Sequence, residues 1–323
     1  MIEILTAGKE ALEKAVQLIK KGELVAFPTE TVYGLGANAL DEKAVRKIFE
    51  VKGRPNDNPL IVHIADFCDL DKVAVVSGIV KKRAERLKKF WPGPLTVVLP
   101  KNGIVPNIVT AGLESVAIRI PDSKFALELI RKSGVPISAP SANLSGKPSP
   151  TNALDVFQDM AGKIELIVDG GNCKIGVEST VVDLTSDKVE ILRPGKITLE
   201  ELKEALGEEV VVREYKPGEK LRSPGMKYRH YAPNAKLIVV QGEKKKVRAR
   251  IKRMIKENNK LGIKTERIIF DSAKDGMKTF FFKLRKFDNF GVKVILAEDV
   301  SCEGEWMALS NRLRRAASEI IVV

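Results

Sequence analysis

The alternation of helix-like and strand-like segments is the feature that most constrains this fold. In residues 10–21, Leu12, Ala15, Val16 and Ile19 recur at helical spacing, and the segment stops at Gly22. A short apolar run over residues 24–27 follows and predicts a buried strand. The same alternation continues to residue 207 and predicts an α/β domain around a twisted, mixed sheet.

The remaining elements of this first domain follow from the same patterns. Helices are predicted over residues 42–51, 81–90, 125–133, 152–160 and 199–206. Strands are predicted over residues 60–64, 95–99, 116–120, 135–138, 165–168, 180–184 and 189–192. Asp41 is the expected N-cap of the second helix, which stops at Gly53 and Pro55.

Residues 208–235 have the composition of a linker, with several prolines and glycines and little periodicity. The run SPGMKYRHYAP over residues 223–233 is nevertheless rich in aromatic and cationic side chains. Two interpretations remain open: a strap that closes over a binding site, and a plain linker docked by its aromatic residues.

A smaller Rossmann-like α/β domain is predicted over residues 236–323. Strands over residues 237–240, 267–270 and 292–296 alternate with helices, the last of which begins near Glu305. This order is typical of a parallel sheet with crossover helices. The segment contains no GxGxxG turn, so the sequence assigns it no nucleotide site.

Composition excludes several classes of protein. The chain of 323 residues is 44% hydrophobic and 30% charged, which is typical of soluble globular proteins. No apolar run reaches the roughly 18 residues of a membrane span, and the N-terminus has no apolar signal core. The three cysteines are scattered and there are two histidines, so we expect no structural zinc site and a cytoplasmic protein with reduced thiols.

The positive charge of the chain is unevenly placed. The net charge is +13, and residues 236–323 hold 21 Lys and Arg against 11 Asp and Glu, a net +10. An RNA-facing surface would explain this excess. A solvated helix face over residues 244–260 is the simpler explanation, and both interpretations stay open.

Cations in the first domain stand beside turns rather than on helix faces. Lys52 and Arg54 follow a predicted helix, and we expect both at an exposed helix end. Arg119 ends a predicted strand, and Arg193 precedes a Pro-Gly turn. Because ligands of α/β sheets bind outside the strand ends, the four side chains predict a polyphosphate pocket.

The absence of several catalytic motifs limits the reactions that this chain could catalyse. The sequence contains no Walker GxxxxGK[ST], no GxSxG and no HExxH. A reaction that works by positioning and charge stabilisation therefore fits better than covalent catalysis. Nucleotidyl or phosphoryl transfer with Mg²⁺ is a reaction of this type.

Five motifs together resemble one family. They are PTETVYGLG at residues 28–36, KGRP at residues 52–55 with the following NPL and His63, Ser141-x-Asn143, ESTVVD at residues 178–183, and LRPG at residues 192–195. In this order they resemble the YrdC-like threonylcarbamoyl-AMP synthases. The SPGMKYRHYAP run and the basic α/β tail are similar to the longer, Sua-type members.

The resemblance implies an activity. L-threonine, bicarbonate and ATP with Mg²⁺ would yield threonylcarbamoyl-AMP, pyrophosphate and water. The product would be handed to the tRNA threonylcarbamoyl transferase for modification of tRNA position 37. Direct contact with tRNA is left open.

The resemblance also implies roles for individual residues. ATP would be bound by Lys52, Arg54, Asn58, Ser115, Ser141, Asn143, Ser149, Arg193 and Asn234. Threonine would be bound by Thr31, His63, Arg119, Ala139 and Ser179. Lys52 and Arg54 would be catalytic, His230 and Tyr231 would close the site from the linker, and no protein metal site is implied.

Two other functions compete with this one. An RNA-binding module would use the basic tail, but the first domain has few aromatic residues for base stacking and no RRM or KH signature. A carbamoyl-transfer maturation factor sharing the YrdC-like domain would need zinc fingers, which three cysteines cannot supply.

Overall fold

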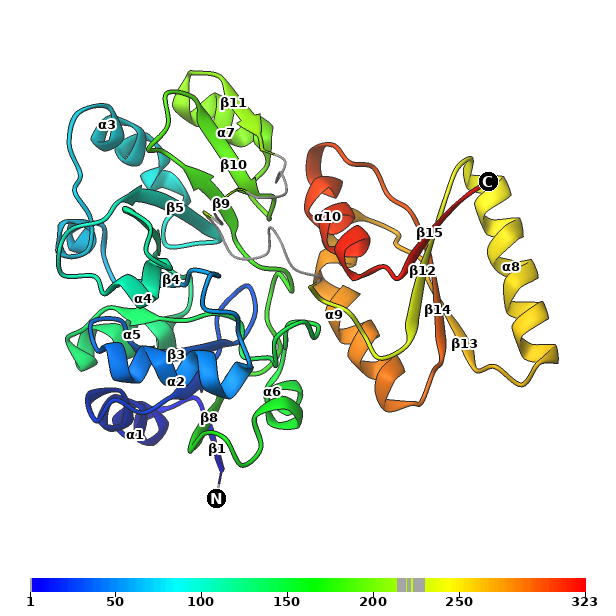
Figure 1. The fold of residues 1–323 in the computed structure, drawn as a ribbon, viewed down its shortest axis with the longest axis horizontal. Helices are drawn as coiled ribbons and strands as arrows, with labels where there is room; N and C mark the ends of the chain where they lie inside the picture. Colours follow the sequence, from blue (N-terminus) through cyan, green and yellow to red (C-terminus); the bar gives the residue numbers. More distant parts are fainter. Residues whose placement is uncertain (1, 214–218, 220–221, 223–229) are drawn as a thin grey trace.

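Two sheets organise the chain, an eleven-stranded mixed sheet and a four-stranded parallel sheet (Figure 1). The computed structural model describes residues 2–213, 219, 222 and 230–323. The large sheet lies in the first part of the chain, and the parallel sheet lies in the last part. This arrangement confirms the predicted α/β fold with a smaller second domain.

The large sheet combines parallel and antiparallel neighbours. Its strands, in sheet order, are β1 (Glu3–Thr6), β8 (Leu166–Asp169), β2 (Val25–Phe27), β3 (Gly34–Asn38), β7 (Ile137–Ser138), β4 (Ile61–His63), β6 (Ser115–Arg119), β5 (Leu95–Pro100), β9 (Thr180–Asp183), β10 (Val189–Arg193) and β11 (Val210–Val212). Its helices are α1 (Lys9–Lys20), α2 (Glu42–Lys52), η1 (Phe67–Lys72), α3 (Gly78–Leu87), η2 (Lys88–Phe90), α4 (Asn107–Thr110), α5 (Lys124–Ser133), α6 (Ala153–Met160) and α7 (Leu199–Leu206).

Helices cover the two faces of this sheet unevenly. Helices α1 and α5 pack together over β2 and β8, whereas α2, α3, α6 and α7 share the main core. Successive residues of β4, β5 and β6 alternate between that main core and a small apolar cluster on the opposite face, formed by Ile61, Val98, Ala117, Val181 and Leu192. The face of this small cluster is left open to a pocket.

The second domain has strand order β13 (Thr265–Ile268), β14 (Val294–Glu298), β12 (Lys236–Gln241), β15 (Glu319–Val322), all parallel. Helix α8 (Lys244–Lys260) covers one face. Helices α9 (Ala273–Asn289) and α10 (Met307–Ala316), the latter preceded by η3 (Gly304–Trp306), cover the other face (Figure 1). Alternate residues of β12 face the two layers, which is why this strand is apolar throughout.

Each predicted helix and strand is present, with ends that shift by up to three residues. The sequence does not predict β1, β3, β11 and β15. Strand β11 lies in the segment predicted as linker and pairs in parallel with β10, so the large sheet extends past residue 207. Strand β15 adds a fourth strand to the second domain, where the pattern predicts three.

Glycine explains why β3 escapes prediction, since its sequence GLGAN has low strand propensity. A Cβ atom at Gly36 would lie 2.6 Å from Phe27 Cε1 and 2.9 Å from Ile137 Cγ2. Only glycine therefore lets β3 lie between β2 and β7 at this spacing.

The close approach at Gly36 generates a stability prediction. We expect Gly36→Val to lower the free energy of unfolding by about 1–3 kcal/mol or more, because overpacking forces β2 and β7 apart. Denaturant unfolding measures the change. Gly103→Val is the matched control, since no atom lies within 4 Å of its added Cβ. Equal stabilities of the two variants would contradict the packing argument.

Candidate active site

A pocket of about 690 Å³, including its open mouth, gathers the cations predicted from the sequence. It is lined by Thr31, Val32, Lys52, Arg54, Ile61, His63, Arg119, Ala139, Pro140, Ser141, Asn143, Ser145, Gly146, Lys147, Glu178, Ser179, Arg193, His230 and Tyr231. His63, Arg119 and Arg193 are the last residues of β4, β6 and β10. The pocket thus lies where ligands of α/β sheets bind, outside the strand ends.

Helix α2 delivers Lys52 and Arg54 to the pocket. Its N-terminus is capped by Asp41, whose carboxylate accepts the Lys43 and Ala44 N–H groups, as predicted. Gly53 ends the helix in the left-handed conformation, with φ +59°. The chain therefore turns directly after Lys52 and places Arg54 on the pocket side.

Lys52 is not at an exposed helix end, so that expectation is wrong. Its residue is only 3% exposed, because the Ser141–Asn143 run folds back over the helix terminus. The Lys52 ammonium donates to the main-chain carbonyls of Ser141, at 2.6 Å, and Asn143. Lys52 therefore also holds the run that carries two predicted ATP ligands.

The guanidinium of Arg54 is held by main-chain carbonyls. It donates to the carbonyls of Asn58 at 3.0 Å and Pro59 at 2.8 Å. Burial, followed by the charge of Arg193, lowers the pKa of Arg54 to about 9. Burial and the charge of Arg54 lower the pKa of Lys52 well below its usual range. An anion in this pocket would relieve both effects.

Residues predicted to bind threonine meet on the other side of the pocket. Arg119 forms a buried ion pair with Glu30 at 2.6 Å and donates to the Thr31 hydroxyl and the Gly93 carbonyl. These contacts use three of its five N–H groups and leave two for a ligand. Ser179 is hydrogen-bonded to Thr96 and Arg193, and Ala139 also lines the pocket.

His63 is buried, with an Nδ1 atom that has no hydrogen-bond partner among the described residues. Burial and the nearby Arg119 lower the pKa of His63 to about 3. The imidazole is therefore neutral at physiological pH and offers an acceptor. One carboxylate oxygen of Glu30 and the Ser138 hydroxyl are also buried without a partner in the described chain. Such groups require a partner, which a bound ligand can supply.

Four predicted ATP ligands lie outside the pocket lining. Asn58 is buried behind Arg54, and its side-chain amide has no partner in the described part of the chain. Ser149 donates to Glu178, which does line the pocket. Asn234 contacts Lys147 at a neighbouring cavity. Ser115 begins β6, about 13 Å along the strand from Arg119 at 3.3 Å per residue.

The linker reaches the pocket through His230 and Tyr231. Tyr231 has φ +65°, which is unusual for a bulky side chain. Its ring packs against Phe281 of α9 at 5.1 Å and under the Arg312 guanidinium of α10 at 5.6 Å. The second domain therefore holds Tyr231 at the pocket. The SPGMKYR part of the predicted strap, residues 223–229, lies outside the described residues.

Two site features escaped the sequence analysis. Glu178 is the carboxylate that faces the pocket directly, and Ser145, Gly146 and Lys147 form one of its walls. Glu178 stands in the ESTVVD motif, which offered a signal. Burial alone would raise the pKa of Glu178, but Arg312 and Arg193 hold it below its usual value. Nothing in the amphipathic helix pattern singles out Arg312, whose neighbours Arg314 and Arg315 are also arginines.

Fold and site together define a two-domain α/β protein with a buried, cationic pocket suited to a nucleotide. Residues 17–195 match the Sua5/YciO/YrdC model, described as telomere recombination, and residues 197–318 match the model for the threonylcarbamoyl-AMP synthase C-terminal domain. The chain belongs to the Sua5/YciO/YrdC family, in its two-domain form.

Two relatives of similar length carry the same name. The chain is 50% identical to the threonylcarbamoyl-AMP synthase of Pyrococcus abyssi, over 95% of this chain and 94% of that protein. It is 45% identical to the Bacillus subtilis protein of that name, over 98% and 96% of the two chains. The structure of P. abyssi Sua5 complexed with L-threonine superposes with a TM-score of 0.93 at 48% identity and covers 100% of this chain and 99% of that one.

Other relatives contain one domain. A putative threonylcarbamoyl-AMP synthase of Methanocaldococcus jannaschii is 37% identical, and 96% of its length matches 62% of this chain. It is too short to contain both domains. The comparisons support the synthase interpretation and give no support to the RNA-binding alternative.

The contacts of Lys52 predict a double defect in Lys52→Ala. Synthase activity should fall by roughly 100-fold or more, because a fixed cation next to developing phosphate charge is lost. The free energy of unfolding should fall by about 1–3 kcal/mol, because two buried carbonyls lose their donor. Steady-state kinetics and denaturant unfolding separate the two effects. Lys43→Ala, exposed on the same helix, should change neither; activity of Lys52→Ala within about threefold of the parent would contradict the pocket assignment.

The depressed pKa of His63 predicts a pH-dependent stability. An unfolded histidine titrates near pH 6.5, so between about pH 3 and 6.5 the unfolded state binds the extra proton. Stability is therefore lost as pH falls through this window. His63→Asn should remove up to about 1.4 kcal/mol per pH unit of this loss, measured by urea unfolding between about pH 6 and 4. Parallel curves for parent and variant would contradict a buried, neutral His63.

Proposed function

We propose that the chain condenses L-threonine, bicarbonate and ATP into threonylcarbamoyl-AMP. The single observation that carries the proposal is the pocket in which Lys52, Arg54, Arg119 and Arg193 converge beside a neutral His63. The P. abyssi relative has been crystallised with L-threonine, which supports an amino-acid site in this fold.

The residues divide into two groups within the pocket. Arg119 has two free N–H groups that match a threonine carboxylate, and Nδ1 of His63 can accept from the threonine hydroxyl or ammonium group. Lys52, Arg54 and Arg193 face the remaining space, where they would hold the triphosphate.

The reaction balances as two steps. The threonine amine adds to bicarbonate, with loss of water, to give N-carboxythreonine. A carboxylate oxygen of this carbamate then attacks the α-phosphorus of ATP, the bond to the β-phosphate breaks, and pyrophosphate leaves. The fixed cations stabilise the charge that develops on the phosphate oxygens.

Magnesium is proposed to arrive with ATP rather than to reside in the protein. The described residues contain no group of three or more His, Cys, Asp or Glu that could form a metal cage. This composition fits Mg²⁺, which keeps phosphate and water ligands and takes few from the protein. When bound, it would neutralise charge on the phosphates.

Two further proposals follow from the resemblance to the threonylcarbamoyl-AMP synthases. The acyl-adenylate is handed to the tRNA threonylcarbamoyl transferase for modification of position 37. The reaction takes place in the cytoplasm, in keeping with the free cysteines Cys68, Cys173 and Cys302. Among the described residues no helix is both long and apolar enough to cross a membrane.

The linker is proposed to keep water from the carbamate and the acyl-adenylate. Its described end is anchored to the pocket wall, because the Ala232 N–H donates to the Gly146 carbonyl at 2.8 Å. We expect ATP and threonine together to slow hydrogen exchange at residues 230–235, followed by mass spectrometry. Exchange at the same rate with and without both substrates would contradict this role and indicate that the linker only connects the two domains.

Substrate dependence tests the function directly. Pyrophosphate release from ATP should require threonine and bicarbonate together, because the carbamate is the nucleophile. The measurement is coupled pyrophosphate detection, with mass spectrometry of the acyl-adenylate. Equal pyrophosphate release when threonine is omitted would contradict the synthase function and indicate a simple nucleotide hydrolase.

A further inference from the structure

One wall of the pocket, the loop of residues 144–149, has no regular secondary structure. Ser145, Gly146 and Lys147 of this loop line the pocket. The Ser145 N–H donates to the Lys52 carbonyl at 2.8 Å, so the loop lies directly against a predicted catalytic residue. What fixes this loop therefore shapes the pocket.

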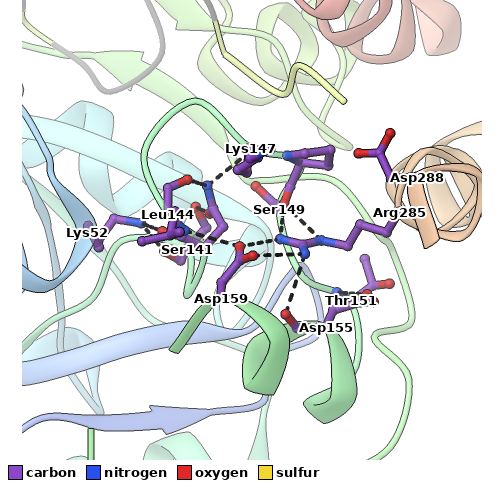
Figure 2. A network of polar contacts seen from close by, with 12 residues as sticks. Lys52, Ser141, Leu144, Lys147, Ser149, Thr151, Asp155, Asp159, Arg285 and Asp288 are labelled. Atoms are coloured by element: carbon purple, nitrogen blue, oxygen red, sulfur yellow. Dashed lines mark hydrogen bonds and ion pairs between the residues drawn. The ribbon is translucent and has the colours of Figure 1, made fainter. Parts of the chain in front are cut away.

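The first end of loop 144–149 is held by Asp159 of α6. One Asp159 oxygen accepts the Leu144 N–H at 3.1 Å and also pairs with Arg285 of α9 at 2.7 Å (Figure 2). Arg285 donates further to the Pro148 carbonyl, at 2.5 Å through its Nη2. The Arg285 and Asp159 side chains are only 7% and 11% exposed.

The second end of the loop is held by Glu178. The Ser149 hydroxyl donates to one Glu178 oxygen, and Nε of Arg312 donates to the other at 2.8 Å. Arg312 is fully buried and also donates to the Pro194 carbonyl at 2.8 Å, next to Arg193 of the pocket. The two ends are thus held in the same way. A buried carboxylate accepts a hydrogen bond from the loop, and an arginine of the second domain neutralises that carboxylate.

Each arginine is needed to keep its buried carboxylate ionised and in place. Removing one partner of a buried ion pair leaves an uncompensated charge, which must protonate or turn toward water. Either change would release Ser149 or Leu144 from its present position. A small displacement of a substrate-binding loop can cost up to about 100-fold in rate.

We propose that Arg285 and Arg312 of the second domain are positioning residues for ATP: each neutralises a buried carboxylate that holds one end of loop 144–149. They do not line the pocket themselves: Arg312 acts through Glu178, whereas Arg285 acts through Asp159 and by donating to the Pro148 carbonyl of the loop. The identity of the nucleotide rests on the proposed function. Threonine should be unaffected, because neither arginine bonds to the side chains of Thr31, His63, Arg119 or Ser179 in the described structure; the Ser179 hydroxyl is held by Thr96 and Arg193 instead.

The test measures ATP and threonine affinity by titration calorimetry in the full chain. Arg312→Met should weaken Mg·ATP binding by about 10- to 100-fold and change threonine binding by less than about twofold. The double variant Arg312→Met with Glu178→Gln should bind ATP better than Arg312→Met alone, because glutamine keeps an acceptor for Ser149 without the buried charge. Arg285→Met should also weaken ATP binding, but adding Asp159→Asn should restore less of it, because the hydrogen bonds to the Pro148 carbonyl stay lost.

Arg314→Met is the matched control. Arg314 lies on the same helix and pairs with Asp299 inside the second domain, away from the loop. It should leave ATP affinity within about twofold of the parent, even if its unfolding temperature falls. Arg312→Lys keeps the positive charge but loses the several fixed N–H donors of the guanidinium. This variant replaces Arg312→Met if the methionine variant does not fold. It should weaken ATP binding by several-fold.

Two outcomes would overturn the proposal. One is unchanged ATP affinity in a folded Arg312 variant. The other is a loss of ATP affinity that Glu178→Gln does not reduce, which would indicate domain packing rather than charge neutralisation. A parent chain that binds ATP but forms no threonylcarbamoyl-AMP would contradict the proposed function instead, and the ATP comparison would still stand.

Discussion

Buried positive charge is the constraint on which the rest of this structure depends. Lys52, Arg54 and Arg193 are each held by main-chain carbonyls, which orient the cations without neutralising them. Arg119 differs, since it pairs with the Glu30 carboxylate. The strand ends and loops thus hold like charges together against their repulsion and leave their field directed at the pocket. A polyanionic substrate is what relieves this repulsion.

The second domain neutralises two carboxylates beside the pocket. Its helices α9 and α10 send Arg285 and Arg312 into the first domain, where they meet Asp159 and Glu178. The hydrophobic core of the second domain also includes Val32 and Val177 from the first. The two domains are therefore joined by both ion pairs and buried apolar contacts.

Tyr231 joins the linker to both domains. Its positive φ is a strained conformation that persists only where the surroundings over-determine it. Here the conformation is held by three contacts: the ring of Phe281, the Arg312 guanidinium and the hydrogen bond of the Ala232 N–H. The strained residue is buried and lines the pocket.

The sequence alone determined the order of helices and strands and the motifs that line the pocket, because periodicity, caps and turn residues act over a few positions. It missed β3, whose glycines pack where propensity predicts no strand, and β15, which pairs with a strand far along the chain. Only the tertiary structure decided that Lys52 is buried and that Arg285 and Arg312 reach the first domain. These facts depend on contacts between residues far apart in the chain, which local patterns do not encode.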